Sequence, residues 1–221
     1  MTELKGEREG VVRYRLDFES GPAPVAADIA ALDAWRHVLF RLGLIGGNDP
    51  ERYHGLGFGN VSRRLPGSDL RFVISGTQTG HLPHAGANHY CTVTHCDPAA
   101  NRVVAEGPVK PSSEALTHGA VYVADPAAGC VLHAHTPLIW RRARALGLPA
   151  TPADVPYGTP TMAEAVAVLC QRHPGEVFVM RGHEDGVIAY GHDEAEAGQR
   201  LVTALAAALA LDQETGQTVR V

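Results

Sequence analysis

The chain has 221 residues, of which 45% are hydrophobic, and its formal net charge is −5 at pH 7. This length is sufficient for a sizeable core in one domain, and the lack of a basic excess argues against a nucleic-acid partner. The longest apolar run, residues 202–211, is too short to span a bilayer, so we expect no membrane partner.

The cysteines and the N-terminus indicate where the protein works and how it is divided. The four cysteines form no CxxC pair, and the N-terminal residues are too charged for a signal peptide. We therefore expect a cytoplasmic protein with free thiols. Residues 1–25, which include Gly21-Pro22-Ala23-Pro24, are expected to form a flexible N-terminal arm, and residues 26–221 a single domain.

The remaining sequence interleaves helical and strand patterns without internal repeats. A helix is predicted over residues 26–45, with Gly46-Gly47 ending it. The other predicted helices are 112–123, 136–146, 160–172 and 193–212, and the predicted strands are 58–64, 70–75, 89–95, 101–106, 129–135, 176–181 and 186–190. Because Asp97-Pro98 separates two of these strands, we expect a hairpin there. This mixture favours an α/β fold, a three-layer α/β/α arrangement with a central mixed, largely antiparallel sheet.

The predicted strand 129–135 ends in two histidines, His133 and His135. Side chains alternate between the faces of a strand, so both imidazoles should project from one face while Leu132 and Ala134 pack on the other. Two imidazoles on one face could bind one divalent ion such as zinc. The alternative is a pair of ordinary surface or core histidines.

A catalytic metal site typically has three protein ligands and keeps a further position open for water or substrate. The best candidate for the third ligand is His183, where an apolar strand runs into a turn flanked by Gly182 and Gly186. Such a turn can direct a ligand into a cleft. Taken alone, His183 fits the same ordinary alternative.

Glu114 lies in the segment Pro111-Ser112-Ser113-Glu114, directly before a predicted helix. A serine cap and an acid in the first turn are common at ordinary helix starts. The unpaired N–H groups and the serine hydroxyls could equally bind a phosphate. The two interpretations remain open on the residues alone.

These features together resemble the class II aldolase/adducin family, which includes fuculose-phosphate aldolase, ribulose-phosphate 4-epimerase and methylthioribulose-phosphate dehydratase. The resemblance covers roughly residues 28–212 and rests on five motifs in the order the family has them. The motifs are Gly59-Asn60-Val61-Ser62, Ile74-Ser75-Gly76-Thr77-Gln78-Thr79-Gly80, Pro111-Ser112-Ser113-Glu114, His133-Ala134-His135 and His183.

The resemblance implies a role for each matched residue. His133, His135 and His183 would bind one divalent ion per chain, usually zinc, with manganese, cobalt or nickel as alternatives. Glu114 would be the general acid/base. The implied phosphate site consists of Asn60, Ser75, Gly76, Ser112 and Ser113, although turn chemistry alone can explain Asn60 and Ser75.

The chemistry expected of such a site is cleavage of a C–C bond in a hydroxyketone or sugar, with a phosphate on the substrate. The ion would polarise the carbonyl and stabilise the enediolate, while Glu114 moves the proton. Epimerisation and dehydration are alternative outcomes at the same site. The resemblance also implies a homotetramer with active sites between subunits.

Several residues depart from the family pattern. The segment around Asp154 resembles a part of the 4-epimerases in which an aspartate acts on the substrate of a neighbouring subunit, so Asp154 is a second catalytic candidate, or else a turn residue. The tail after His192 contains no tyrosine or histidine, although the fuculose-type aldolases and the epimerases of this family use a tyrosine near the C-terminus. Glu184 and Asp185 follow His183 where the family commonly has a glycine; they could tune the site, bind substrate or form a solvated turn.

The non-catalytic alternative is a scaffold similar to adducin, which shares the fold. Adducin-type domains lack the metal ligands, whereas this chain retains three candidate histidines and the glutamate. A purely structural metal site would be expected to use four protein ligands, often with cysteine. Cys130 should face the opposite side of its strand from His133, which argues against it as a fourth ligand.

Overall fold

A computed structural model describes residues 11–67 and 70–215 of the chain. Its centre is an eight-stranded sheet with the strand order β1-β5-β4-β3-β2-β6-β8-β7. Strand β1 pairs with β5 in parallel and the other neighbouring pairs are antiparallel. The predicted mixed, largely antiparallel sheet is therefore confirmed.

The elements follow one another in the order the sequence predicts, with one additional strand. The strands are β1 Arg15–Ser20, β2 Asn60–Arg64, β3 Phe72–Ser75, β4 Tyr90–Asp97, β5 Arg102–Gly107, β6 Cys130–His135, β7 Phe178–Val179 and β8 Gly186–Gly191. The helices are α1 Ala26–Arg41, α2 Ala115–Ala124, α3 Pro137–Arg142, α4 Pro160–Arg172 and α5 Glu194–Thr215, with short 3-10 turns at Tyr53–Gly55 (η1) and Ala87–His89 (η2).

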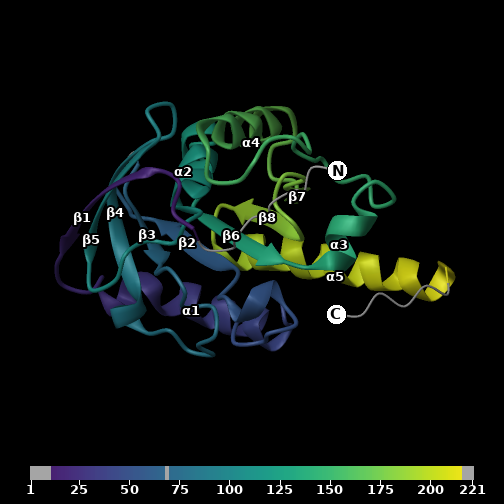
Figure 1. The fold of residues 1–221 in the computed structure, drawn as a ribbon, viewed down its shortest axis with the longest axis horizontal. Coiled ribbons are helices and arrows are strands. Elements are labelled where there is room, and N and C mark those ends of the chain that lie inside the picture. The colour runs from purple at the N-terminus through teal and green to yellow at the C-terminus, as the bar shows by residue number, and fades with distance from the viewer. Residues whose placement is uncertain (1–10, 68–69, 216–221) are drawn as a thin grey trace, which may run out of the picture.

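Helices cover both faces of the sheet, which gives the predicted α/β/α layers. Figure 1 shows α2 and α4 on one side and α1 and α5 on the other. Each face has its own apolar core, because alternate strand residues point in opposite directions. Val131 of β6 packs in the core under α2 and α4, whereas Leu132 and Ala134 pack in the core under α1, α3 and α5.

Helix α1 ends at Arg41, four residues before the predicted end at 45. Gly43 adopts a φ of 70°, its N–H donates to Phe40 O, and the N–H of Leu44 donates to Leu39 O. This pair of bonds is the Schellman arrangement, which glycine favours because it adopts positive φ without strain. Gly43, and not Gly46-Gly47, therefore ends the helix.

The prediction of a flexible arm over residues 1–25 is wrong for residues 15–20. These residues form β1, which pairs with β5 from Arg15 opposite Arg102 to Ser20 opposite Gly107. A parallel pairing with a strand far along the chain leaves no local signal, and the neighbouring Gly-Pro segment resembles a linker. Residues 1–10 lie outside the described part of the chain, and the single domain over 26–221 remains a prediction.

Two further elements are shorter than predicted. Helix α3 stops at Arg142 and not at 146, and β7 contains two residues in place of the predicted strand 176–181.

The four cysteines are buried free thiols. Among the described residues, no helix combines the length and the apolarity that crossing a membrane requires.

Candidate metal centre

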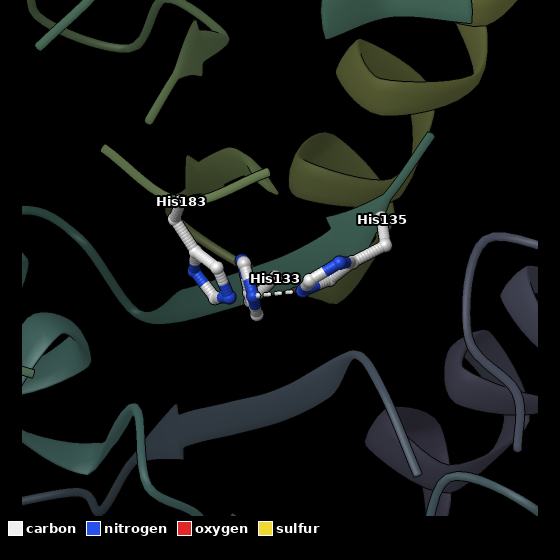
Figure 2. A group of neighbouring side chains, drawn as sticks. All are labelled: His133, His135 and His183. Atoms are coloured by element: carbon white, nitrogen blue, oxygen red, sulfur yellow. Dashed lines mark hydrogen bonds between the residues drawn. The ribbon is translucent and has the colours of Figure 1, made fainter. Parts of the chain in front are cut away.

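Three histidines converge on one point between the sheet and α2. His133 and His135 project from β6, and His183 lies in the turn between β7 and β8; Figure 2 shows the three rings facing one another. One ligand atom from each lies within 4.8 Å of the other two. The Nε2 atoms of His133 and His135 are 3.0 Å apart. A tetrahedral zinc ion places its ligand atoms about 3.4 Å apart, so the spacing of His133 and His135 is close to that of such an ion.

Strand alternation accounts for the placement of the first two rings. Leu132 and Ala134 belong to the core on the opposite face, as does Cys130. The predicted common face of His133 and His135 is therefore confirmed, and Cys130 is directed away from them. In the pairing with β2, Asn60 lies directly opposite His133.

Hydrogen bonds fix the orientation of the first ring and the turn that carries the third. The Nδ1 atom of His133 lies 3.2 Å from Val187 O, so Nδ1 carries the proton and Nε2 keeps a lone pair toward the other two histidines. The N–H of His183 donates to Met180 O, and His183 O accepts from the N–H of Gly186. These bonds close the turn around the third ring.

Burial makes these imidazoles suitable ligands. His133 and His135 are fully buried and His183 is 3% exposed. Burial, followed by the neighbouring His183 and Arg52, lowers the pKa of His135 well below its usual value. A neutral imidazole is the form that binds a metal, so the donor set fits a divalent transition-metal ion.

Glu114 completes the centre from the side of α2. It occupies the cap position of this helix and its side chain is fully buried. Its Oε1 atom lies 3.6 Å from Nδ1 of His183. The structure therefore brings the predicted acid/base beside a predicted ligand. The expected serine cap is absent from this position, and Ser112 Oγ instead accepts from the N–H of Glu114.

A small polar pocket lies beside the segment that leads into α2. Asn60, Gly76, Ser112 and Ser113 line it together with the loop 77–80. Four of the five residues predicted to bind phosphate therefore share one pocket. Asn60 connects the pocket to the histidine cluster because it pairs with His133 across the strands.

Ser75 and Asp154 are placed differently from the other predicted residues. Ser75 is fully buried and its Oγ accepts a hydrogen bond from the N–H of Val61, so its hydroxyl supports β2. Asp154 is exposed in the loop before α4, and it belongs neither to the histidine cluster nor to the polar pocket. Within one copy of the chain, Asp154 is therefore separate from this centre.

The loop that borders the pocket is held by a buried arginine of α1. Arg36 is fully buried and donates to Thr79 O at 2.5 Å and to Leu82 O at 2.6 Å. A buried arginine has to be satisfied by fixed acceptors, and here the acceptors are the loop carbonyls. The sequence signal for this residue is its position on the apolar side of α1, one turn after Leu32.

Two tyrosines pack against the histidines, and neither is a predicted site residue. The ring of Tyr157 stacks on His183, with centroids 4.3 Å apart. Tyr53 packs edge-on against His135 and donates its hydroxyl to Asp185. Burial and Asp185 raise the pKa of Tyr53, which keeps the phenol protonated as a donor. Tyr53 lies in an irregular segment far from the histidines in sequence, so no local pattern identifies it.

Comparison with known proteins places this chain in a family. Residues 50–210 match the class II aldolase and adducin N-terminal domain, which is more than half of the chain. The chain belongs to the class II aldolase/adducin family. This family contains metal-dependent aldolases, epimerases and dehydratases, and its enzymes act on sugar phosphates and often form oligomers.

The similar proteins include one curated relative and several solved structures. A methylthioribulose-1-phosphate dehydratase of Gluconacetobacter diazotrophicus is 42% identical over 78 residues, which span 35% of this chain and 34% of that protein. The match thus covers only about a third of the relative.

Two solved structures share the fold of this class II aldolase-like chain. A putative aldolase/epimerase/decarboxylase from Klebsiella pneumoniae, YgbL, has a TM-score of 0.64 at 22% identity, covering 88% of this chain and 92% of that chain. The L-fuculose-1-phosphate aldolase from Thermus thermophilus has a TM-score of 0.64 at 20% identity, and the match covers 89% of this chain and 100% of that chain. At these identities the likeness concerns the fold alone.

Proposed function

We propose that the protein is a divalent-metal-dependent lyase that cleaves a C–C bond of a phosphorylated hydroxyketone or sugar by aldol chemistry. The observation that carries this proposal is the convergence of His133, His135 and His183 beside the buried Glu114. Membership of the class II aldolase/adducin family supports it. A cytoplasmic location stays a prediction from the sequence.

The three histidines would hold one divalent ion per chain. We propose Zn²⁺, because imidazole nitrogens suit zinc and three protein ligands leave a position open, while Mn²⁺, Co²⁺ and Ni²⁺ fit the same donors. When bound, the ion polarises the substrate carbonyl and offsets the negative charge that develops as the C–C bond breaks. The bond from His133 Nδ1 to Val187 O keeps one ligand ring in the orientation this requires.

Glu114 is the proposed general acid/base. Its buried carboxylate lies beside His183, so it would be close to a substrate bound at the proposed metal centre. Glu114 takes the proton in one step and returns it in the other. The fixed start of α2 limits the positions available to the carboxylate, which supports proton transfer along a defined direction.

The polar pocket beside α2 is the proposed phosphate site. Asn60 and Ser113 offer an amide and a hydroxyl, and the pocket lies at the N-terminal end of a helix, where anions are favoured. The predicted set also contains Ser75, Gly76 and Ser112. Because Ser75 Oγ accepts a bond from Val61, its proposed contribution is to hold β2 in place beside the pocket.

Asp154 is proposed to act on a substrate bound by a neighbouring copy. Its exposed position before α4 makes it available to another subunit. This proposal requires the homotetramer with active sites between subunits that the family resemblance implies. It would also supply a second acid, which the tail after His192 does not provide through a tyrosine.

Dehydration of a sugar phosphate is the second candidate reaction. The observation in its favour is the 42% identity over 78 residues with a methylthioribulose-1-phosphate dehydratase. The same centre would serve, with Glu114 removing a proton from carbon and returning it to the neighbouring hydroxyl, which leaves as water. Epimerisation would use the same residues to cleave the C–C bond, and the aldehyde would then be added back.

Metal content tests the centre directly. Elemental analysis of protein purified without chelator or affinity-tag histidines should find about one divalent ion per chain in the wild type and none in His135→Ala. His173→Ala is the matched control, because His173 is exposed and pairs with Glu176. No metal in the wild type after reconstitution would overturn the enzyme proposal in favour of a scaffold similar to adducin.

The reaction is then decided by product analysis. The metal-loaded protein is incubated with fuculose-1-phosphate, ribulose-5-phosphate and methylthioribulose-1-phosphate. An aldehyde together with a three-carbon ketone, one of the two carrying the phosphate, indicates aldol cleavage, whereas loss of water without chain cleavage indicates the dehydratase. Metal-loaded protein that converts no phosphorylated hydroxyketone or sugar would contradict the proposed function.

A further inference from the structure

Asp185 contacts both segments that carry the histidines of the proposed metal centre. It lies two residues after His183, in the turn between β7 and β8, and is 8% exposed. Its backbone oxygen accepts from the N–H of Thr136, the residue after His135, at 2.9 Å. Its Oδ2 atom accepts from the hydroxyl of Tyr53 at 3.0 Å. The neighbouring Glu184 is exposed, so Asp185 is the acid directed inward.

Tyr53, which donates to Asp185, also packs against the ring of His135. The two rings meet edge to face, with centroids 4.8 Å apart and an interplanar angle of 74°. Phe58 also packs against His135, at 5.7 Å, and the guanidinium of Arg52 lies 4.4 Å over Phe58. Arg52 Nη2 donates to His135 O at 3.4 Å. The segment from Arg52 to Phe58 therefore covers His135.

The backbone at both ends of the Tyr53–Asp185 hydrogen bond is unusual. Tyr53 has a φ of 48° and Asp185 a φ of 59°, in the left-handed region that residues other than glycine seldom adopt. Such conformations persist only where the surroundings determine them, and they are concentrated at functional sites. The hydrogen bond from Tyr53 to Asp185 therefore joins two residues that both have this conformation.

We propose that Tyr53 and Asp185 form a latch that sets the distance between His135 and His183 and so increases the affinity of the metal centre. The three contacts form a closed circuit: Asp185 to Thr136 through the backbone, Thr136 to the adjoining His135, and His135 through the Tyr53 ring and hydroxyl back to Asp185. The inference rests on the proposed function, because it assumes that these histidines bind an ion. Both residues act through the ligands and are positioning residues.

The test uses variants that remove the latch with little other change. Tyr53→Phe keeps the ring against His135 and removes the hydroxyl. Asp185→Gly removes the carboxylate, keeps the backbone oxygen and tolerates the positive φ. The double variant tests whether Tyr53 and Asp185 act as one unit. The matched control is Tyr90→Phe, because Tyr90 donates to Asp33 Oδ1 at 2.9 Å in a second tyrosine–aspartate pair.

Two readouts that are independent of activity are measured with Co²⁺. These are the dissociation constant, by competition with a chelator, and the visible absorption spectrum, which reports the ligand geometry. Loss of partners that orient metal ligands typically weakens affinity about 10- to 100-fold. We expect this range for Tyr53→Phe and Asp185→Gly, with altered spectra, and for the double variant no further loss. Tyr90→Phe should retain the wild-type affinity and spectrum.

Each contrary outcome has a distinct meaning. A wild-type affinity and spectrum in both single variants would overturn the latch and leave the proposed function in place. Multiplicative losses in the double variant would also overturn it, because the two residues would then act separately. If wild-type protein bound no Co²⁺, the metal centre and the latch would both be overturned. Metal-free unfolding of Tyr53→Phe and Tyr90→Phe, compared side by side, separates a loss of fold from a loss of ligand geometry.

Discussion

The Nδ1 atom of His183 lies 3.6 Å from the Oε1 atom of Glu114, and both side chains are buried. One residue belongs to the turn between β7 and β8 and the other to the start of α2, so two layers of the fold meet at this contact. A carboxylate in this position can transfer protons beside a bound substrate without occupying a ligand position. This relationship motivates the first prediction.

Glu114→Gln should strongly reduce turnover without removing the metal. Glutamine has nearly the same shape as glutamate, but it cannot take and return a proton, and general acid/base catalysis typically contributes about 10²- to 10⁴-fold. We expect kcat to fall by that factor while metal content stays at the wild-type level. Steady-state kinetics with elemental analysis measures both, and Glu106→Gln, at an exposed position of β5, serves as the control. Unchanged turnover would show that another group moves the proton.

Arg36→Lys should weaken binding of a phosphorylated substrate. The planar guanidinium reaches Thr79 O and Leu82 O together, and a lysine ammonium cannot reproduce this fork. The loop 77–80 should then be less fixed, and we expect the KM to rise about 10-fold, roughly 1.4 kcal/mol, at unchanged kcat. Arg102→Lys is the control, since Arg102 pairs with Asp17 at an exposed position. An unchanged KM would exclude a role of Arg36 in the pocket.

His118 should make the metal-free protein sensitive to acid. Burial lowers the pKa of His118 from its ordinary 6.5 to about 3 in the folded protein. The unfolded chain therefore binds the proton first, and stability is lost as pH falls from about 6.5 toward 3, by up to about 1.4 kcal/mol per pH unit.

Urea unfolding at several pH values measures this dependence. His118→Asn, which retains a polar group beside Ser62 Oγ, should give a shallower decline between pH 6 and pH 4 than the wild type. The comparison concerns the slope, since the variant also loses packing at neutral pH. Equal slopes in the two proteins would show that His118 does not contribute to acid unfolding.

Gly182→Ala should displace His183. A Cβ atom at residue 182 would overlap the backbone oxygen of Val155, so one of the two segments has to move. Overpacking of this kind typically costs about 1–3 kcal/mol. We expect thermal unfolding at a lower temperature and reduced metal content. Gly147→Ala is the control: it has a positive φ but open space, so it should lose less stability and no metal.

Local patterns were sufficient for much of the fold. The alternation of apolar residues placed His133 and His135 on one face, and the helix predicted over 160–172 agrees with α4 at Pro160–Arg172. The Asp97-Pro98 turn identified the hairpin of β4 and β5. These features depend on neighbours along the chain, where backbone geometry and burial act together.

Other features depended on distant partners. The strand β1 exists because it pairs with β5, and the two-residue β7 is limited by its pairing with β8. The polar pocket forms because loops from three regions meet at the start of α2, and this meeting exposes Asn60 and Ser113 to the pocket while Ser75 stays bonded to β2. Local propensity does not report such pairings.

The sequence by itself determined the order of the elements from α1 onward, the family and the candidate ligands, because strand periodicity and motif order are written along the chain. Only the tertiary structure decided that His183 joins the other two histidines, that Glu114 lies beside it, and that Tyr53 binds Asp185 from a distant part of the chain. The physical reason is that sheet pairing and core packing fix the distances between these side chains. Neither pairing nor packing is a property of a local segment.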